Sequence, residues 1–408
     1  MIFLLAIFAI FLRFYFLFKK GFDFDIDLYI KWGDAILRGG LFDLYSKPHN
    51  FVVNYPPLIP LLSSAWLALA KSIGISSGVS LKIFFKLLPT LIEAVLTIIC
   101  ATYIWRSQIK YKTALLSVIL IQPALAFVSA AWGQTDVIFT LLILLGFMVQ
   151  EKNSTFATFL LFLSLMAKPQ ALPAVVIYFL YLLFKKNWKN AFVQLAFFIS
   201  LSWLAAELFR YFSGANLISI YINSSGYFKN ISLNAFNIWW LIHGANSWNI
   251  QDNAAILLNP KNTGFILLIL FEIPALIYLY HVRDDHSNVV NKKARDLPKV
   301  LLVLAYSYLI FFIFPTEIHE RYLYPAVALL AIPAILDKRV FLIYIILTVT
   351  FFVNAFTVLQ SVYPQFGSYI AGFGNLLIGD WTRLIALLNL IVVIYFATYF
   401  FNESAKKV

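Results

Sequence analysis

The chain has 408 residues, of which 62% are hydrophobic and only 12% are charged. Soluble globular proteins are nearer about 45–50% apolar and about 25% charged, so an ordinary soluble enzyme is excluded. The net charge of +12 does not indicate nucleic acid here, because Lys and Arg mark cytoplasmic loops and anionic lipid surfaces in membrane proteins. The single cysteine, Cys100, excludes a disulfide framework and a thiolate metal site.

Long apolar runs recur from one end of the chain to the other, and the mean hydropathy is +0.84. They predict an all-α, polytopic integral membrane protein, because helices satisfy their backbone hydrogen bonds internally within lipid. We expect about twelve transmembrane helices, with a range of roughly 11 to 14. The expected spans are residues 1–18, 83–105, 113–130, 133–149, 155–167, 170–184, 191–208, 264–281, 299–314, 322–336, 340–359 and 383–400.

The first run is too long for a signal peptide and lacks a small-residue cleavage site, so we interpret it as a retained helix. Residues 57–75 are ambiguous between a span and an interfacial helix. If they do not cross, the short basic loops share one side, as expected for the cytoplasm, with both termini. We therefore predict a single domain, 1–408, in which the external loops 19–56 and 209–262 form the cover of a site.

The first external loop holds five Asp residues between positions 21 and 45, directly after a predicted transmembrane helix. From about residue 25 it is expected to form an amphipathic surface helix, which places Asp25, Tyr29 and Trp32 on one face at i, i+4, i+7 spacing. An Asp at a helix N-terminus is also an ordinary cap. The sequence does not choose between Asp23, Asp25 and Asp27 as a functional acid.

Short motifs on the same predicted side carry most of the other unusual polar groups. Gln134 and Asp136 lie at a turn between two spans, which is a common place for polar side chains. Lys168 follows an apolar run and precedes a proline, with Gln170 beside it. The Lys168 side chain either extends to the membrane interface or stays at membrane depth, and a charged residue at membrane depth is a candidate for function.

Two further stretches hold amide, aromatic and charged groups. Tyr55 precedes two prolines, which fix an extended backbone before a helix. Asn234 and Asn237 lie among tryptophans in the second external loop, where such residues suit sugars but are also ordinary at an interface. The bend PTEIHERYLYP crowds His319, Glu320 and Arg321 between two apolar segments, and a polar hairpin would explain each charge singly.

Together these groups offer a carboxylate base, cations that can hold a phosphate, amides and aromatics for a carbohydrate, and apolar walls for a lipid tail. The cations are Lys168, Arg321 and His319. The sequence has no Gly-rich phosphate loop, HExxH, Cys/His zinc set or GxSxG motif, so a nucleotide-bound substrate is not indicated.

The ordered motifs resemble the GT-C superfamily of membrane glycosyltransferases that use polyprenyl-phosphate sugars. Within it they are most similar to the GPI-anchor second-mannosyltransferase family and its prokaryotic relatives. The residues that carry the resemblance are Asp25 with Tyr29 and Trp32, Tyr55-Pro56-Pro57-Leu58, Trp132-Gly133-Gln134-Thr135-Asp136, Lys168-Pro169-Gln170, Asn234-Ala235-Phe236-Asn237-Ile238-Trp239, and His319-Glu320-Arg321-Tyr322. Arg321 stands where the family's His-Glu-Lys motif has Lys.

The resemblance implies a GT-C-type architecture and an inverting transfer of one sugar, with mannose favoured, from a polyprenyl-phosphate donor to a glycan or lipid-linked acceptor. It implies Asp25 as the catalytic general base and Arg321, His319 and Lys168 as ligands of the donor phosphate. No metal cofactor is implied, although three neighbouring Asp residues could hold a divalent ion. The residues expected to bind acceptor or sugar are Asp27, Tyr29, Trp32, Tyr55, Gln134, Asp136, Gln170, Asn234, Asn237 and Glu320.

Two alternatives stay open. A membrane glycan polymerase or ligase would share this architecture and differ in substrate size, and a sugar or polyprenyl-lipid transporter or flippase would also need buried charges. The expected location of the site is the non-cytoplasmic face of the plasma membrane in a prokaryote, or of the endoplasmic reticulum in a eukaryote.

Overall fold

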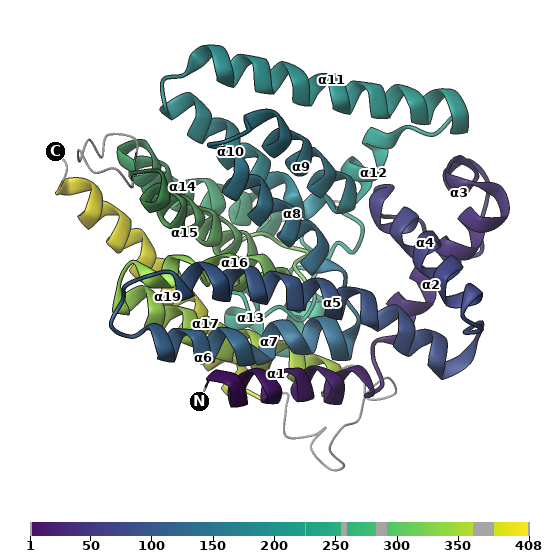
Figure 1. The fold of residues 1–408 in the computed structure, drawn as a ribbon, viewed down its shortest axis with the longest axis horizontal. Helices are drawn as coiled ribbons and strands as arrows, with labels where there is room; N and C mark the ends of the chain where they lie inside the picture. Colours follow the sequence, from purple (N-terminus) through teal and green to yellow (C-terminus); the bar gives the residue numbers. More distant parts are fainter. Residues whose placement is uncertain (1, 225, 254–258, 283–291, 362–378, 407–408) are drawn as a thin grey trace. The chain divides into compact units, whose positions relative to one another are not determined.

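The computed structural model describes residues 2–224, 226–253, 259–282, 292–361 and 379–406 (Figure 1). Regular structure within these ranges is helical, and β-type pairing is limited to isolated bridges. The prediction of an all-α chain is therefore confirmed. Of the predicted external loop 209–262, residues 225 and 254–258 lie outside the described ranges.

The chain divides into two compact units. Unit 1 consists of Met1–Leu12, Thr97–Phe127 and Gly226–Val408, and unit 2 of Arg13–Leu96 and Val128–Ser225. The boundary falls within α1 (Ile2–Leu17) and α5 (Gly78–Trp105), and just inside the π-helix η1 (Phe127–Trp132). Each unit has its own set of helices and its own polar groups.

Unit 2 contains α2 (Asp23–Gly39), α3 (Leu41–Ser46), α4 (Leu58–Ser72), α8 (Asp136–Val149), α9 (Ser154–Ala167), the 3-10 helix η2 (Pro169–Ala171), α10 (Leu172–Phe184), α11 (Trp188–Ser213) and α12 (Leu217–Ser224). Unit 1 contains α6 (Lys112–Ile121), α7 (Pro123–Ala126), α13 (Ile238–His243), η3 (Gly244–Asn249), α14 (Pro260–Val282), α15 (Lys292–Ile313), η4 (Glu320–Leu323), α16 (Tyr324–Leu330), η5 (Pro333–Ile335), α17 (Lys338–Ser361) and α19 (Trp381–Ala405).

Seven helical segments in the described ranges are long and apolar enough to cross a membrane. They are Gly78–Trp105, Lys112–Trp132, Trp188–Ser213, Pro260–Val282, Asp296–Ile313, Lys338–Gln360 and Trp381–Ala405. Each corresponds to one expected span, and four other expected spans form shorter apolar helices. This is compatible with a polytopic integral membrane protein, while twelve crossings stay a prediction.

The expectation of one continuous helix over residues 322–336 is wrong. The segment consists of η4, the seven-residue α16 and η5. Pro325 and Pro333 each stand near the start of one of these pieces, where a missing N–H is tolerated. In a continuous helix Pro333 would remove a hydrogen bond and clash with the preceding turn, so the helix is interrupted there.

The predicted amphipathic helix after the first span is confirmed as α2, which packs against α4 within unit 2 (Figure 1). Tyr29 and Trp32 belong to its buried face. Gly33 lies against the backbone of α4, because a Cβ at this position would come within 2.7 Å of the Ser63 carbonyl oxygen. This close approach fixes the helix that carries Asp25.

Candidate active site

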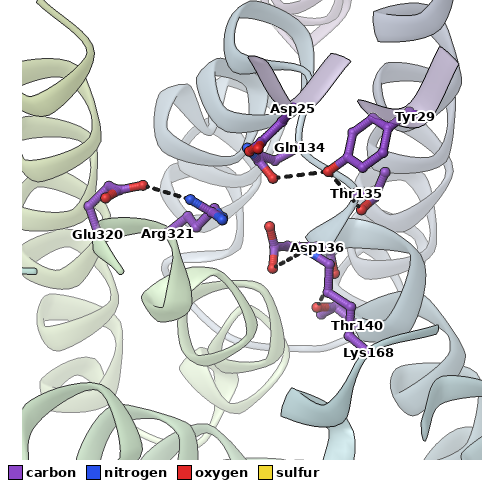
Figure 2. A network of polar contacts seen from close by, with 9 residues as sticks. All are labelled: Asp25, Tyr29, Gln134, Thr135, Asp136, Thr140, Lys168, Glu320 and Arg321. Carbon is purple, nitrogen blue, oxygen red and sulfur yellow. Dashed lines mark hydrogen bonds and ion pairs between the residues drawn. The ribbon is translucent and has the colours of Figure 1, made fainter. Parts of the chain in front are cut away.

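Asp25 and Gln134 form the centre of a polar group in unit 2 (Figure 2). The Gln134 side-chain amide donates to Oδ2 of Asp25. The Tyr29 hydroxyl donates to Oε1 of Gln134 at 3.3 Å and lies 3.5 Å from Oγ1 of Thr135. Gln134 is fully buried and Asp25 is half-buried, so the carboxylate is held by the protein and still reaches the surface.

The turn that carries Gln134 is formed by local backbone geometry. Gly133 has φ of +84°, in the left-handed region that favours glycine. A Cβ at Gly133 would also come within 2.9 Å of the Lys86 side chain. The N–H of Gln134 donates to the carbonyl of Val128 at 3.1 Å, and the N–H of Phe22 donates to that of Trp132 at 3.3 Å. The turn is therefore tied to the start of α2.

The three neighbouring acids of α2 have different partners. Lys82 forms ion pairs with Asp23 at 3.1 Å and with Asp27 at 3.0 Å. Asp25 contacts Gln134 instead. A single lysine thus pairs with both flanking carboxylates, and Asp25 is the acid of the three that contacts the WGQTD motif.

Three aromatic rings lie beside this group. The centroids of Tyr29 and Trp32 are 5.6 Å apart, those of Trp32 and Tyr55 are 5.2 Å apart, and those of Tyr29 and Tyr55 are 6.3 Å apart. The Trp32 indole donates to the carbonyl of Val52 at 2.8 Å, and the Tyr45 hydroxyl donates to that of Tyr55 at 2.7 Å. These bonds hold the extended segment before α4 against α2.

Lys168 and Asp136 form a buried ion pair at 3.0 Å, and each side chain is only 1% exposed (Figure 2). Asp136 begins α8, and Lys168 lies just after α9 in an extended conformation that Pro169 favours. The Lys168 ammonium also lies 5.0 Å from the centroid of the Tyr55 ring. Because this is a cation–π distance, the ion pair and the aromatic rings form one connected group.

A second polar group, which includes Glu320 and Arg321 (Figure 2), lies in unit 1 in the turn that begins with His319. The Arg321 guanidinium donates to Oε1 of Glu320 at 3.2 Å, and Nδ1 of His319 lies 3.9 Å from Oε2 of Glu320. Burial alone would raise the pKa of Glu320, but the neighbouring His319 and the charge of Arg321 outweigh it and lower the pKa below its usual value. The His319 ring contacts Phe228 and Tyr322 edge-on, at 5.2 and 5.3 Å.

The turn is held by the segment that begins at Gly226. The N–H of Leu233 donates to the carbonyl of Ile318 at 2.9 Å, and the N–H of Glu317 donates to that of Asn230 at 3.0 Å. The Glu317 carboxylate accepts from the N–H of Gly226. Lys261 pairs with the same carboxylate at 3.2 Å. Glu317 therefore links the turn to Gly226 and Lys261, and Glu320 is the residue that contacts Arg321.

The two predicted sugar-binding asparagines have structural contacts. Oδ1 of Asn237 accepts from the N–H groups of Trp239 and Trp240 at 3.1 Å each, so Asn237 caps α13. The carbonyl of Asn234 accepts from Nδ2 of Asn354 at 2.9 Å. Oδ1 of Asn354 in turn accepts from the N–H of Phe236 at 2.9 Å.

Sequence reasoning missed Asn354, Asn389 and Lys82. Asn389 donates to the carbonyl of Phe236 at 3.2 Å, so two helices, α17 and α19, hold the loop before α13. The available signal was a lone asparagine inside each of two apolar runs, since buried amides in a membrane segment need partners. Nothing in the sequence around Lys82 indicated that it would pair with Asp23 and Asp27.

The structure thus brings together one set of predicted residues in each unit. Unit 2 gathers Asp25, Tyr29, Trp32, Tyr55, Gln134, Asp136 and Lys168, whereas Asp27 pairs with Lys82 and Gln170 lies half-buried in η2. Unit 1 gathers His319, Glu320 and Arg321, and Asn234 forms an isolated bridge with His319. Among the described residues, no three His, Cys, Asp or Glu side chains group as metal ligands.

Comparison with models of known protein families gives no match, and neither does comparison with curated proteins.

Proposed function

We propose that the chain is a membrane glycosyltransferase that moves a single sugar, with mannose favoured, from a polyprenyl-phosphate donor to a hydroxyl of a glycan or lipid-linked acceptor. The observation that carries the proposal is the group in unit 2. There a half-buried carboxylate, Asp25, is oriented by a buried amide, Gln134, beside the aromatic rings of Tyr29, Trp32 and Tyr55.

These groups suit the chemistry of a sugar hydroxyl. A carboxylate that accepts an amide N–H keeps a fixed direction and still has lone pairs for a substrate O–H. Aromatic side chains offer apolar faces with polar edges, which suits a pyranose ring. In the proposal, Asp25 therefore accepts a hydrogen bond from the acceptor hydroxyl. The rings of Trp32 and Tyr55 contact the acceptor sugar that carries this hydroxyl.

The proposed reaction is a single displacement. Asp25 takes the proton of the acceptor hydroxyl, and the acceptor oxygen forms a bond with the anomeric carbon. The bond between that carbon and the phosphate oxygen breaks, and its electron pair leaves with the lipid phosphate. Because attack and departure occur on opposite sides, the configuration at the anomeric carbon inverts.

The leaving phosphate gains negative charge, and cations oriented toward it would stabilise the transition state. The proposal gives this role to Arg321 and His319, as predicted from the sequence. Arg321 can hold two phosphate oxygens at once, because guanidinium groups bind such pairs in a fork. Lys168 has one donor occupied by Asp136 and further N–H groups for a phosphate.

The test is a transfer assay with the purified full chain. It compares polyprenyl-phosphate mannose, polyprenyl-phosphate glucose and nucleotide-linked mannose against a panel of glycan and glycolipid acceptors, and determines the anomeric configuration of the product. We expect transfer from a polyprenyl-phosphate donor only, with inversion.

Retention of configuration would contradict the single displacement. Transfer from the nucleotide sugar would contradict the donor class. A third outcome is that no donor supports transfer, but labelled lipid-linked sugar moves across the bilayer of vesicles that contain the protein. In that case the transporter alternative replaces the proposal.

A further inference from the structure

Glu272 is an acidic side chain near the middle of α14, one of the segments that are long and apolar enough to cross a membrane (Figure 1). The helix packs against α15 and α19 within unit 1. The proposed transfer reaction does not use Glu272. Because a charged side chain at membrane depth is costly, an acid in such a place is itself a candidate for function.

The Glu272 carboxyl has one hydrogen-bond partner in the part of the chain that the structure describes. Oε1 of Glu272 lies 2.6 Å from Oγ of Ser307, in α15. The same Oγ lies 3.0 Å from the carbonyl oxygen of Val303, one turn earlier in that helix. A serine hydroxyl carries a single hydrogen, so it cannot donate fully to both oxygens. A protonated Glu272 would supply the second hydrogen, by donating to Ser307 while Ser307 donates to Val303.

No cation among the described residues forms an ion pair with Glu272. The charged residues of α15 stand two turns or more before Ser307, and those of α19 stand in its first and last turns. The other ionisable side chains of these two helices are tyrosines, which are uncharged at neutral pH. One of them, Tyr306, donates to the carbonyl of Phe271 at 2.9 Å. The surroundings of Glu272 therefore offer hydrogen bonds but no compensating charge.

Glu93 in α5 provides the contrast, because it is a buried carboxyl in another segment that is apolar enough to cross a membrane. Nε and Nη2 of Arg13 donate to its two carboxylate oxygens at 2.6 and 2.7 Å. The guanidinium supplies both hydrogens and the opposite charge, so Glu93 is held as a carboxylate. Glu272 has no such partner, and a carboxyl without a cation in an apolar segment is less costly as the neutral acid.

The Glu272 side chain is half-buried and lies at the edge of an exposed apolar face of α14. Phe265 and Ile269, seven and three residues earlier on this side of the helix, are 61% and 56% exposed. In a membrane-spanning helix such side chains contact acyl chains. A small apolar molecule dissolved in the bilayer can therefore approach the carboxyl.

We propose that Glu272 is a proton-binding site inside the membrane, a neutral carboxylic acid that donates to Ser307 and is reached from the bilayer. Three observations support it: the second hydrogen that the contacts of Ser307 require, the lack of a paired cation among the described residues, and the half-buried position. The proposal is independent of the transfer reaction, because no substrate group is assigned to Glu272.

Infrared spectroscopy of the purified full chain at neutral pH tests the protonation. A protonated carboxyl has a C=O stretch that a carboxylate lacks, and this stretch moves to higher frequency when the acid loses a hydrogen-bond partner. We expect Glu272→Gln to remove such a band and Ser307→Ala to shift it to higher frequency, whereas Glu93→Gln should remove none. If Glu272→Gln removes only carboxylate absorption, Glu272 is ionised and the proposal is overturned.

Labelling of the full chain in phospholipid vesicles with dicyclohexylcarbodiimide tests access from the bilayer. This apolar reagent adds to a protonated carboxyl: the acid proton moves to one nitrogen, the carboxyl oxygen bonds to the central carbon, and the acyl group then migrates to the other nitrogen. We expect this adduct at Glu272, by mass spectrometry of peptides, and its loss in Glu272→Gln.

The control within the same chain is Glu207, which is also half-buried on an apolar helix but pairs with Arg210. We expect no adduct at Glu207, because its carboxylate lacks the proton that the reaction needs. Equal labelling of Glu207 and Glu272 would contradict the special state of Glu272. Stronger labelling of Glu272 by a water-soluble carbodiimide than by the apolar one would contradict access from the bilayer.

Discussion

The two polar groups of this chain use their charges differently. In unit 2, Asp25 accepts from an amide, and the nearby cation, Lys168, is paired with a separate carboxylate, Asp136. In unit 1, Glu320 contacts Arg321 directly and lies near His319, within three consecutive residues. Burial alone would raise the pKa of Glu320, but its neighbours His319 and Arg321 outweigh it, so the pKa is lowered and the carboxylate keeps its charge.

The proposed function gives the two carboxylates separate roles: Asp25 takes the proton of the acceptor, and Glu320 holds the guanidinium of Arg321 in a fixed orientation. The two groups share one requirement, because a buried charge is tolerated only where its partner is held in place: Lys168 pairs with Asp136, and Arg321 with Glu320.

The largest effect on stability is expected from Lys168→Met. It removes one partner of a buried ion pair, and breaking such a pair typically costs about 3–5 kcal/mol. Equilibrium unfolding in detergent measures the loss, with the exposed Lys189→Met as the control. If the two variants unfold alike, the buried pair between Lys168 and Asp136 does not stabilise unit 2.

Asn354→Ala tests the support of the polar turn in unit 1. It removes hydrogen bonds to the Phe236 N–H and the Asn234 carbonyl, both buried, and we expect a loss of about 2–3 kcal/mol. Thr350→Ala on the same helix is the control, because its hydroxyl bonds only within α17 at 3.3 Å. Equal stability of the two variants would contradict the role of Asn354.

A smaller loss is expected from Asn237→Ala, which removes the cap of α13. Loss of an N-cap costs about 1 kcal/mol, and Asn237→Ser should restore most of it because a hydroxyl also accepts from the first turn. Thermal unfolding measures both variants. If Ser were as damaging as Ala while sugar binding also disappeared, Asn237 would act as a ligand, as the sequence alone predicted.

The pH dependence of stability tests the fixed charge of Glu320. Its pKa is lowered in the folded state, so its contribution is present above the ordinary value of 4.5 and is lost as the pH falls through the lowered pKa. The stability difference between wild type and Glu320→Gln should therefore shrink as the pH falls from 7 toward acid. A difference that grows on acidification would contradict the assignment.

The face of α2 could be predicted from the sequence because helical periodicity alone places Asp25, Tyr29 and Trp32 together. The different partners of Asp23, Asp25 and Asp27 could not, because they depend on Lys82 and Gln134, which approach only in the folded chain. The interruption within residues 322–336 was readable in its two prolines. The cap at Asn237 was readable too, since Asn before an apolar run is a helix-start signal.

The most direct test of the account is the single-turnover transfer rate of Asp25→Asn, measured beside Asp27→Asn. Both changes remove one carboxylate from the same helix, but Asp27 shares Lys82 with Asp23, whereas Asp25 contacts Gln134. A general base contributes about 10²–10⁴-fold, so we predict a loss of that size for Asp25→Asn and less than about threefold for Asp27→Asn. Undiminished transfer by Asp25→Asn would contradict the account.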